Sequence, residues 1–441
     1  MSESTATTEL IVPETDHRED IATFVRWAME QLSLDFRVED GVGRLPLSEA
    51  DRSAFGGRSE LQLDLNGAAS NRQRESIDLD SRFGRWLIGR LRASGPAVHV
   101  RPKQQPTAVK DIAERLFAAY RVEGGQVHLG GCQLADYPFL RLSFAAKEEG
   151  RPCVNHLFVA HDGTSVSPQL AHDLGLLEVE PITALPPRIE EATLNALIAA
   201  GRRMAAKQST SRDPTAAVAD PLVTAVVWVK HVSGQLQFTI GDHTVGLPFS
   251  GWAKLIQAQP YVAKYSGAST FHLAATDDGR IDAFDQIATC EQSGRRGLLQ
   301  EMVTCSVTGK RVLEEFTELC PVTGKHALAD QFATCSVCQQ RVSKTALENG
   351  VCAACRHLAK IKKDDPRLVW ILGEHTGLDR WNRWQLAETE HVYIAEARSL
   401  WKRLLVVVDK ETLAVRHLAA ASRASRYWTP ITGSAQAEWL R

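Results

Sequence analysis

The chain repeats a cysteine-containing phrase every fifteen residues between positions 290 and 338. Aligned at that spacing, the copies read "ATCEQSGRRGLLQEM", "VTCSVTGKRVLEEFT", "ELCPVTGKHALADQF" and "ATCSVCQQRVSKTAL". Cys290, Cys305, Cys320 and Cys335 share one column, and only the fourth copy has a second cysteine three residues later. A fixed period of this kind indicates small units that stack in a line and bury a shared core.

The cysteines that follow complete a metal-type pattern. Cys335, Cys338, Cys352 and Cys355 form two Cys-x-x-Cys pairs separated by thirteen residues. Each pair turns tightly and points both thiolates to one side, so two pairs can close a tetrahedral Zn²⁺ shell. We predict one structural zinc site with these four ligands; a redox pair and an iron–sulfur site are the open alternatives. The basic segment "RHLAKIKK" after the second pair is expected to form a short helix.

Residues 333–363 resemble zinc ribbons and related treble-clef fingers, on the strength of the two Cys-x-x-Cys pairs alone. In those families the metal is structural, and the partners are DNA, RNA or protein. The resemblance therefore implies a folded binding module without choosing among the three partners.

The first three copies have Ser293, Thr308 and Thr323 in place of the second cysteine, each followed by glycine. A hydroxyl is a poor zinc ligand, but it can bond backbone groups of its own turn, and glycine can take the positive φ that the turn needs. We interpret "C-x-x-[ST]-G-[KR]" as a knuckle, here meaning a cysteine-led hairpin turn, that keeps its shape by hydrogen bonding. One leucine per copy is expected to contact the neighbouring unit: Leu298, Leu313 and Leu328.

A second metal site is the alternative explanation of the repeated column. Cys290, Cys305 and Cys320 would supply three ligands, with His326 as the nearest fourth. Such a site would contain no chelating pair, whereas well-formed zinc sites draw on paired ligands.

The charge is divided unevenly along the chain. The net charge is −2, but residues 1–285 hold 29 Lys and Arg against 36 Asp and Glu, whereas residues 286–441 hold 22 against 17. This asymmetry favours an acidic partner, nucleic acid or protein, for the C-terminal third, although an ordinary mixed surface gives the same count. The predicted partner-binding residues recur just after the turns: Lys310, Arg311, Lys325 and Arg341.

The N-terminus shows no basic and apolar leader, and no apolar run is long enough to span a bilayer. We therefore expect a cytoplasmic protein that is not inserted in a membrane. In such a compartment thiols stay reduced, which favours metal over disulfides for clustered cysteines.

Hydrophobic periodicity predicts a multidomain α+β chain. The expected segments are a disordered tail at 1–20, an acidic α+β domain at 21–207, a linker at 208–222, a small antiparallel β module at 223–287, the knuckle array with its zinc site at 288–363, and a Trp-rich antiparallel sheet domain at 366–441. Helices are expected at 21–32, 81–94, 108–120 and 188–207. Tight turns are expected at Asp162–Gly163, at Ser233–Gly234 and at Gly241–Asp242.

Two further groups of residues invite a functional interpretation. His128, His156, His161 and His172 share a strand-rich stretch, but their spacing follows no ligand motif, so surface or hydrogen-bonded histidines are expected. The last segment holds six tryptophans, which are expected to fill a small core, with base stacking or partner anchoring as the alternative. They are Trp370, Trp381, Trp384, Trp401, Trp428 and Trp439.

The chain contains no recognisable catalytic motif. We therefore expect a non-catalytic, zinc-binding interaction or scaffold protein whose array and C-terminal region contact a nucleic acid or an acidic protein. The alternative is an enzyme, or an accessory subunit of a nucleic-acid-processing machine of the helicase type, with its pocket in residues 21–207.

Overall fold

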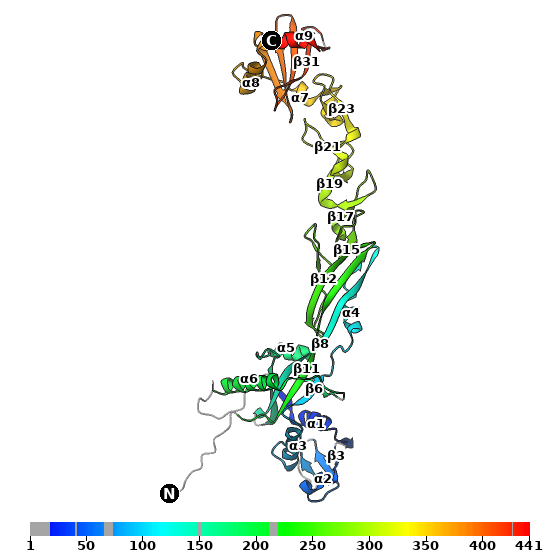
Figure 1. The fold of residues 1–441 in the computed structure, drawn as a ribbon, viewed down its shortest axis with the longest axis vertical. Coiled ribbons are helices and arrows are strands. Elements are labelled where there is room, and N and C mark those ends of the chain that lie inside the picture. Colours follow the sequence, from blue (N-terminus) through cyan, green and yellow to red (C-terminus); the bar gives the residue numbers. More distant parts are fainter. Residues whose placement is uncertain are drawn as a thin grey trace, which may run out of the picture. The chain divides into compact units, whose positions relative to one another are not determined.

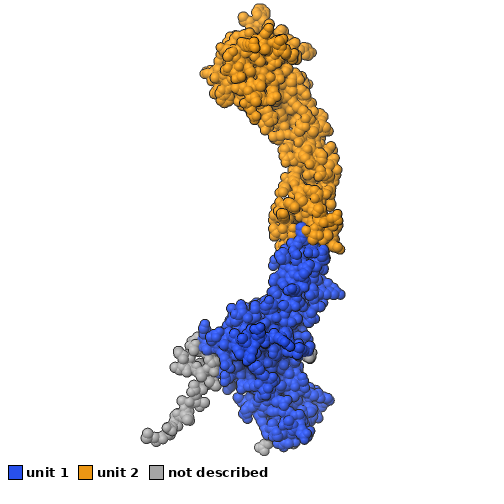
Figure 2. Space-filling model, viewed as in Figure 1, with its two compact units in different colours: residues 1–120, 127–238, 245–259 blue, residues 121–126, 239–244, 260–441 orange. Residues whose placement is uncertain are grey.

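The computed structural model describes residues 18–39, 42–65, 74–148, 151–182, 184–210, 219–425 and 427–441. The chain forms two compact units (Figure 2). The first comprises Met1–Tyr120, Val127–Phe238 and Val245–Gln259, and the second comprises Arg121–Gln126, Thr239–Thr244 and Pro260–Arg441. Helices and several separate sheets are mixed in the chain, which confirms the predicted multidomain α+β class.

The first unit is built on a sheet in the order β1-β9-β8-β11-β6-β10, with β12 also paired to β11. Strand β11 runs parallel to β6, whereas β1 and β8 run antiparallel to β9. The strand bounds are β1 (Arg18–Asp20), β6 (Val98–Pro102), β8 (Gly125–Glu148), β9 (Arg151–Val159), β10 (Val179–Pro181), β11 (Val223–Ile240) and β12 (His243–Trp252).

Helices cover both faces of this sheet. On one face Val154 and Phe158 of β9 share a core with α1 (Ile21–Gln31) and α3 (Arg82–Ala93). On the other face Leu157 and Val159 pack against α6 (Glu191–Thr210). Because both faces are covered, every residue of β9 from Cys153 to Val159 is buried, including the polar Asn155 and His156.

Smaller elements complete the first unit. A second sheet has the order β2-β3-β4-β5. The remaining bounds are β2 (Arg37–Glu39), β3 (Val42–Pro46), β4 (Glu60–Asp64), β5 (Glu75–Ser76), α2 (Glu49–Arg52), η1 (Ser53–Phe55), α4 (Val109–Phe117) and α5 (Pro168–Leu174). The four helices expected from periodicity are therefore present as α1, α3, α4 and α6, with shifted ends.

One predicted turn is wrong. Ser233 and Gly234 lie inside β11, which continues through them to Ile240. Glycine allows a close approach there, because a Cβ on Gly234 would lie 3.0 Å from both the Cys132 Cα and the Phe249 ring and would push these neighbours apart. The turn predicted at Gly241–Asp242 does join β11 to β12, and a turn at Asp162–Gly163 follows β9.

The second unit contains a row of short antiparallel hairpins, each followed by one 3₁₀ turn (Figure 1). Their bounds are β15 (His272–Ala275), β16 (Ile281–Ala283) and η2 (Phe284–Gln286); β17 (Ile287–Thr289), β18 (Arg296–Leu298) and η3 (Leu299–Glu301); β19 (Met302–Thr304), β20 (Arg311–Leu313) and η4 (Glu314–Phe316); β21 (Thr317–Leu319), β22 (His326–Leu328) and η5 (Ala329–Gln331); β23 (Phe332–Thr334), β24 (Arg341–Ser343) and η6 (Lys344–Ala346). The hairpin β15–β16 just upstream has a similar form with a turn one residue shorter, and Thr276 makes the turn hydrogen bonds that the column cysteines make in the later hairpins.

Short elements flank this row. Before it lie β7 (Arg121–Val122), which pairs with β15, and the hairpin β13 (Tyr261–Val262) with β14 (Ser269–Thr270). After it come β25 (Leu347–Glu348), β26 (Val351–Cys352) and α7 (Ala353–Arg356). The helix predicted from "RHLAKIKK" is wrong beyond Arg356, because Ala359 and Lys360 instead form a strand that pairs with the C-terminal sheet.

The chain ends in a six-stranded antiparallel sheet in the order β27-β28-β29-β30-β31-β32. The bounds are β27 (Ala359–Lys360), β28 (Asn382–Glu388), β29 (Val392–Arg398), β30 (Lys402–Asp409), β31 (Val415–Ser422), β32 (Thr429–Pro430), α8 (Pro366–Glu374), η7 (Thr376–Arg380) and α9 (Ser434–Leu440). Alternate residues of the central strands face opposite cores: Tyr393 and Val406 face α8 and η7, whereas Ile394 and Val407 face the last hairpins.

The predicted segment boundaries stay predictions. Residues 1–17 of the expected tail and 211–218 of the expected linker lie outside the described residues, while Arg18–Asp20 form β1 and α6 extends to Thr210.

Candidate metal centre

The four predicted ligands come together. The sulfur atoms of Cys335, Cys338, Cys352 and Cys355 all lie within 4.8 Å of one another. The Cys335–Cys355 sulfur distance is 4.0 Å, and the Cys338–Cys352 distance is 3.7 Å. A tetrahedral shell with Zn–S bonds of about 2.3 Å places sulfurs about 3.8 Å apart, so the donor set fits one tetrahedral ion.

Two tight turns bring the sulfurs together. The Gln339 N–H donates to the Cys335 carbonyl over 3.0 Å, and the Cys335 N–H donates to the Gln340 carbonyl over 2.9 Å. The turn that precedes the second pair is held to the first pair, because the Ser336 N–H donates to the Gly350 carbonyl over 2.9 Å. Gln339 and Gly350 take positive φ values of 58° and 75°, which lets each chain reverse direction.

Donors around the cluster favour the ionised form of the first thiol. Hydrogen bonds with the Cys338, Cys352 and Cys355 side chains lower the pKa of Cys335. The Cys352 N–H also donates to the Cys335 sulfur over 3.3 Å. The same hydrogen bonds raise the pKa of Cys338 and Cys355. A bound cation would favour the deprotonated form of all four ligands, because metal binds the thiolate.

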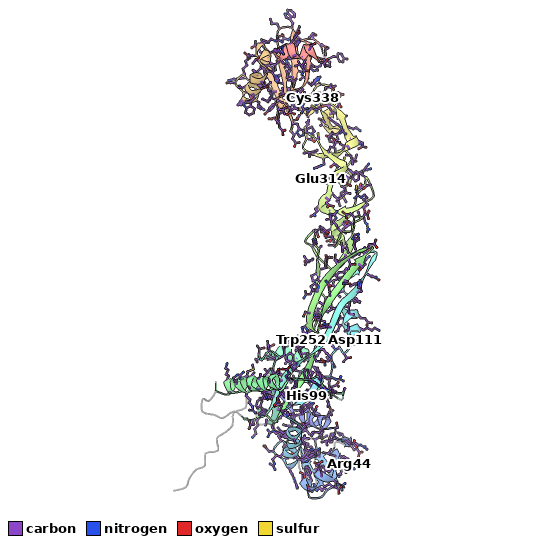
Figure 3. All side chains as sticks on the ribbon, viewed as in Figure 1. Arg44, His99, Asp111, Trp252, Glu314 and Cys338 are labelled. Atoms are coloured by element: carbon purple, nitrogen blue, oxygen red, sulfur yellow. The ribbon has the colours of Figure 1, made fainter. Side chains whose placement is uncertain are left out.

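The cluster is part of a hydrophobic core rather than an exposed appendage. Cys335, Cys338 and Cys352 are buried in one cluster with Ile394 and Val407 of the C-terminal sheet (Figure 3 labels Cys338). Cys355 is half-buried as a residue. The Glu390 N–H, in the turn before β29, donates to the carbonyl of Pro321 over 2.9 Å. Any ion bound here would therefore order the last hairpins, which pack against the sheet.

The single cysteines of the earlier copies have a different use, which sequence reasoning missed. The Leu313 N–H donates to the Cys290 sulfur and the Leu328 N–H to the Cys305 sulfur, each over 3.4 Å. The Ser343 N–H donates to the Cys320 sulfur over 3.3 Å. Each donor lies 23 residues after its acceptor, in the next hairpin, so every column cysteine joins two units.

Two of the hydroxyls that replace the second cysteine accept backbone N–H groups of their own turns, as predicted. The Arg295 and Lys310 N–H groups donate to Ser293 and Thr308, each over 3.4 Å. The following glycines have positive φ. Burial raises the pKa of Cys320, but hydrogen bonds from Ser343 and Thr323 outweigh it and lower the pKa to about 7.

The geometry does not support the alternative second metal site at Cys290, Cys305 and Cys320. Within the described ranges, the four-cysteine cluster is the only set of three or more His, Cys, Asp or Glu ligand atoms close enough to share an ion. The His326 Nδ1 instead lies 3.0 Å from the Thr317 hydroxyl.

All four predicted partner-binding residues are exposed: Lys310, Arg311, Lys325 and Arg341. Arg341 is nevertheless engaged inside the array, since its Nη1 lies 2.7 Å from Glu318, its Nη2 donates to the Ala329 carbonyl over 2.6 Å, and it covers the Phe332 ring. No ion pair within the described part of the chain holds the other three side chains. Their role toward a partner stays a prediction.

The four histidines do not share one site. His156 is buried, with Nδ1 3.0 Å from the Ser143 hydroxyl and Nε2 3.0 Å from Glu19, which also lies 3.3 Å from Arg141. Burial raises the pKa of Glu19, and Arg141 lowers it less. Ser143, His156 and Glu19 are hydrogen-bonded in the order of a catalytic triad. Ser143 and His156 have no exposed surface, so a substrate could not reach them. The other three lie apart on β8, after β9 and on α5: His128, His161 and His172.

The six C-terminal tryptophans divide between the core and the surface. Trp381 and Trp384 are buried, and Trp439 stacks on Trp381 at a centroid distance of 6.0 Å. Trp370 and Trp401 are exposed. The core interpretation therefore holds for part of the set only.

No family model matches this chain, and comparisons with curated proteins and with solved structures found no match. Among the helices of the described residues, none combines the length and the apolar character needed to cross a bilayer.

Proposed function

We propose that the four-cysteine cluster binds one structural Zn²⁺ and that the protein is a non-catalytic interaction or scaffold protein of the cytoplasm. The observation that carries this proposal is the continuous linkage from hairpin to hairpin, ending in a four-sulfur cluster packed against the C-terminal sheet. A closed four-thiolate shell leaves no coordination position for a substrate, so the ion contributes to folding rather than to catalysis.

Zinc is the ion that best suits the donor set, because four thiolates at tetrahedral spacing are typical of structural zinc sites. The measurement is the metal content of the purified chain by elemental analysis. We expect about one Zn per chain, lost in Cys335→Ser and kept in Cys290→Ser. Two Zn per chain, or iron in place of zinc, would contradict this assignment.

The distribution of charge directs the search for a partner to the C-terminal region. Residues 286–348 hold seven basic and seven acidic residues, whereas 349–441 hold fifteen basic and ten acidic residues. The array is thus neutral, and several of its charges pair between successive units, as Arg295 does with Glu315 at 2.7 Å. An acidic partner, nucleic acid or protein, is favoured by the basic excess beyond the array.

The test is affinity purification of the intact protein, followed by identification of the protein and nucleic acid retained with it. We expect an acidic protein or a nucleic acid, released as salt rises, because exposed ion pairs are screened. Lys310→Ala with Lys325→Ala tests whether the array contributes contacts of its own. Retention of a small-molecule substrate, or a thermal shift with nucleotides or metabolites, would favour the enzyme alternative in residues 21–207.

A further inference from the structure

The turn between β29 and β30 presents two large apolar residues to solvent. Ser399 closes this turn: its N–H donates to the Lys402 carbonyl over 2.9 Å, and its hydroxyl accepts the Lys402 N–H over 3.1 Å. Leu400 is 75% exposed and Trp401 is 81% exposed at the tip. Small polar residues and glycine usually occupy such positions, so a well-ordered tip with an exposed Trp indicates a contact surface.

The segment after β31 runs beside this tip and adds a second exposed ring. The Arg423 N–H donates to the Trp401 carbonyl over 2.9 Å, and the Arg403 guanidinium donates to the Ser425 carbonyl over 2.8 Å. The Tyr427 N–H then donates to the Ser425 hydroxyl over 3.0 Å, and the Tyr427 side chain is 85% exposed. Two aromatic rings therefore project from adjoining, hydrogen-bonded backbone.

Neither ring is held by another ring or by a cation within the described residues, unlike its neighbours. Trp428 lies beneath the Arg403 guanidinium at 4.6 Å, and Trp439 stacks on Trp381. Tryptophans that serve the fold are thus supported on at least one side. Trp401 and Tyr427 keep their faces open to a ligand.

The charge around the two rings is positive. Lys402 and Arg423 are exposed, and no carboxylate within the described residues pairs with either. The Lys402 Nζ lies 5.9 Å from the centroid of the Trp439 ring. The nearby Arg398 and Arg403 share one carboxylate, Glu396, at 2.8 and 3.7 Å. A ligand that combines flat rings with a repeating negative charge complements this surface.

We propose that the tip surface, formed by Leu400, Trp401, Lys402, Arg423 and Tyr427, binds single-stranded nucleic acid. Bases stack on Trp401 and Tyr427, and Lys402 and Arg423 neutralise phosphates. A duplex hides its base faces, so the surface discriminates against it. This inference rests on the proposed function and selects its nucleic-acid branch.

The experiment measures binding of the intact, zinc-loaded protein to a fluorescent 15-nucleotide oligothymidylate and to a duplex of equal length. We expect tighter binding of the single strand. Trp401→Ala combined with Tyr427→Ala weakens it by about thirtyfold or more, because each of the two stacked bases is worth about 1–3 kcal/mol. Trp401→Phe retains part of the affinity. Trp370→Ala is the matched control, since Trp370 is 57% exposed on α8 and lies outside the tip surface.

Salt dependence tests the phosphate contacts separately. Lys402→Ala and Arg423→Ala are each expected to reduce the slope of log affinity against log salt by about one. Unchanged binding by the double aromatic variant overturns the proposal, as does equal affinity for the duplex or for polyglutamate. Capture of an acidic protein without any oligonucleotide binding overturns this inference and leaves the proposed function standing. Failure to bind either partner overturns both.

Discussion

The knuckle at Cys305 and the knuckle at Cys335 are held by the same kinds of hydrogen bond and differ in what they pack against. In both, the column cysteine accepts a turn N–H at its carbonyl, from Gly309 over 2.9 Å and from Gln339 over 3.0 Å. In both, its sulfur accepts an N–H from a following hairpin, over 3.4 and 3.3 Å. The shape of the turn therefore does not depend on metal ligands. What differs is the neighbour: a further hairpin in one case, and a hairpin with the C-terminal sheet in the other.

The largest effect is expected from preventing the four-cysteine cluster from holding the proposed zinc. A chelator, or Cys335→Ser, is expected to disorder the last hairpins and to separate them from the sheet, because about 10 kcal/mol or more of metal-binding free energy then no longer supports folding. Thermal unfolding and zinc content follow the loss. Cys290→Ser is the control and keeps its zinc. An unchanged melting temperature in excess chelator would show that packing alone holds the four-cysteine knuckle.

Removing a single-cysteine sulfur is expected to have a smaller, local effect. Cys305→Ala leaves the buried Leu328 N–H without its acceptor, which costs about 1–3 kcal/mol. Hydrogen exchange at the Leu328 amide should accelerate while the zinc content stays constant. Cys305→Ser restores an acceptor and is expected to recover part of the protection. Identical exchange rates in Cys305→Ala and the parent chain would show that the Cys305 sulfur does not protect the Leu328 amide.

The contribution of Cys320 to the stability of the fold is expected to depend on pH. Its pKa is lowered from 9.0 to about 7, since burial, which raises it, is outweighed by hydrogen bonds from Ser343 and Thr323. A lowered pKa stabilises the fold above the unfolded value near 9, and this contribution is lost as the pH falls through 7. The difference in unfolding free energy between the parent and Cys320→Ala should therefore grow from pH 7 to pH 9, by up to about 1.4 kcal/mol per pH unit. A pH-independent difference would mean that the thiol stays neutral.

The smallest expected effect is at the ion pair that joins the third and fourth cysteine-containing hairpins. Arg341 and Glu318 lie 2.7 Å apart and are both about half-exposed. A double-mutant cycle with alanine at both positions should give a coupling of about 0.2–1 kcal/mol, reduced by salt. A coupling several times larger would make charge, rather than sulfur, the main link between units.

The sequence predicted the parts of this design that depend on residues near one another. The column spacing, the glycine turns and the Cys-x-x-Cys pairs are local, so the hairpins and the four-sulfur cluster could be anticipated from them. The bond from the Leu328 N–H to the Cys305 sulfur could not be, because its donor is brought close only when two hairpins stack. The same limit explains the missed continuation of β11 through Gly234, where strand packing decides the role of the glycine. Exposure of Trp401 likewise depends on where the chain turns, which composition does not reveal.

The offset of 23 residues between each sulfur and its donor has a consequence for how such a chain can grow. The offset is one fifteen-residue period plus eight, so a duplicated copy would receive its donor from the next copy and offer its own sulfur to the one before it. Gain or loss of a whole period preserves every link, whereas an insertion of any other length between a sulfur and its donor breaks one. The length of the array can therefore change in steps of one fifteen-residue period. A duplication within the gene can add such a step without changing the contacts between units.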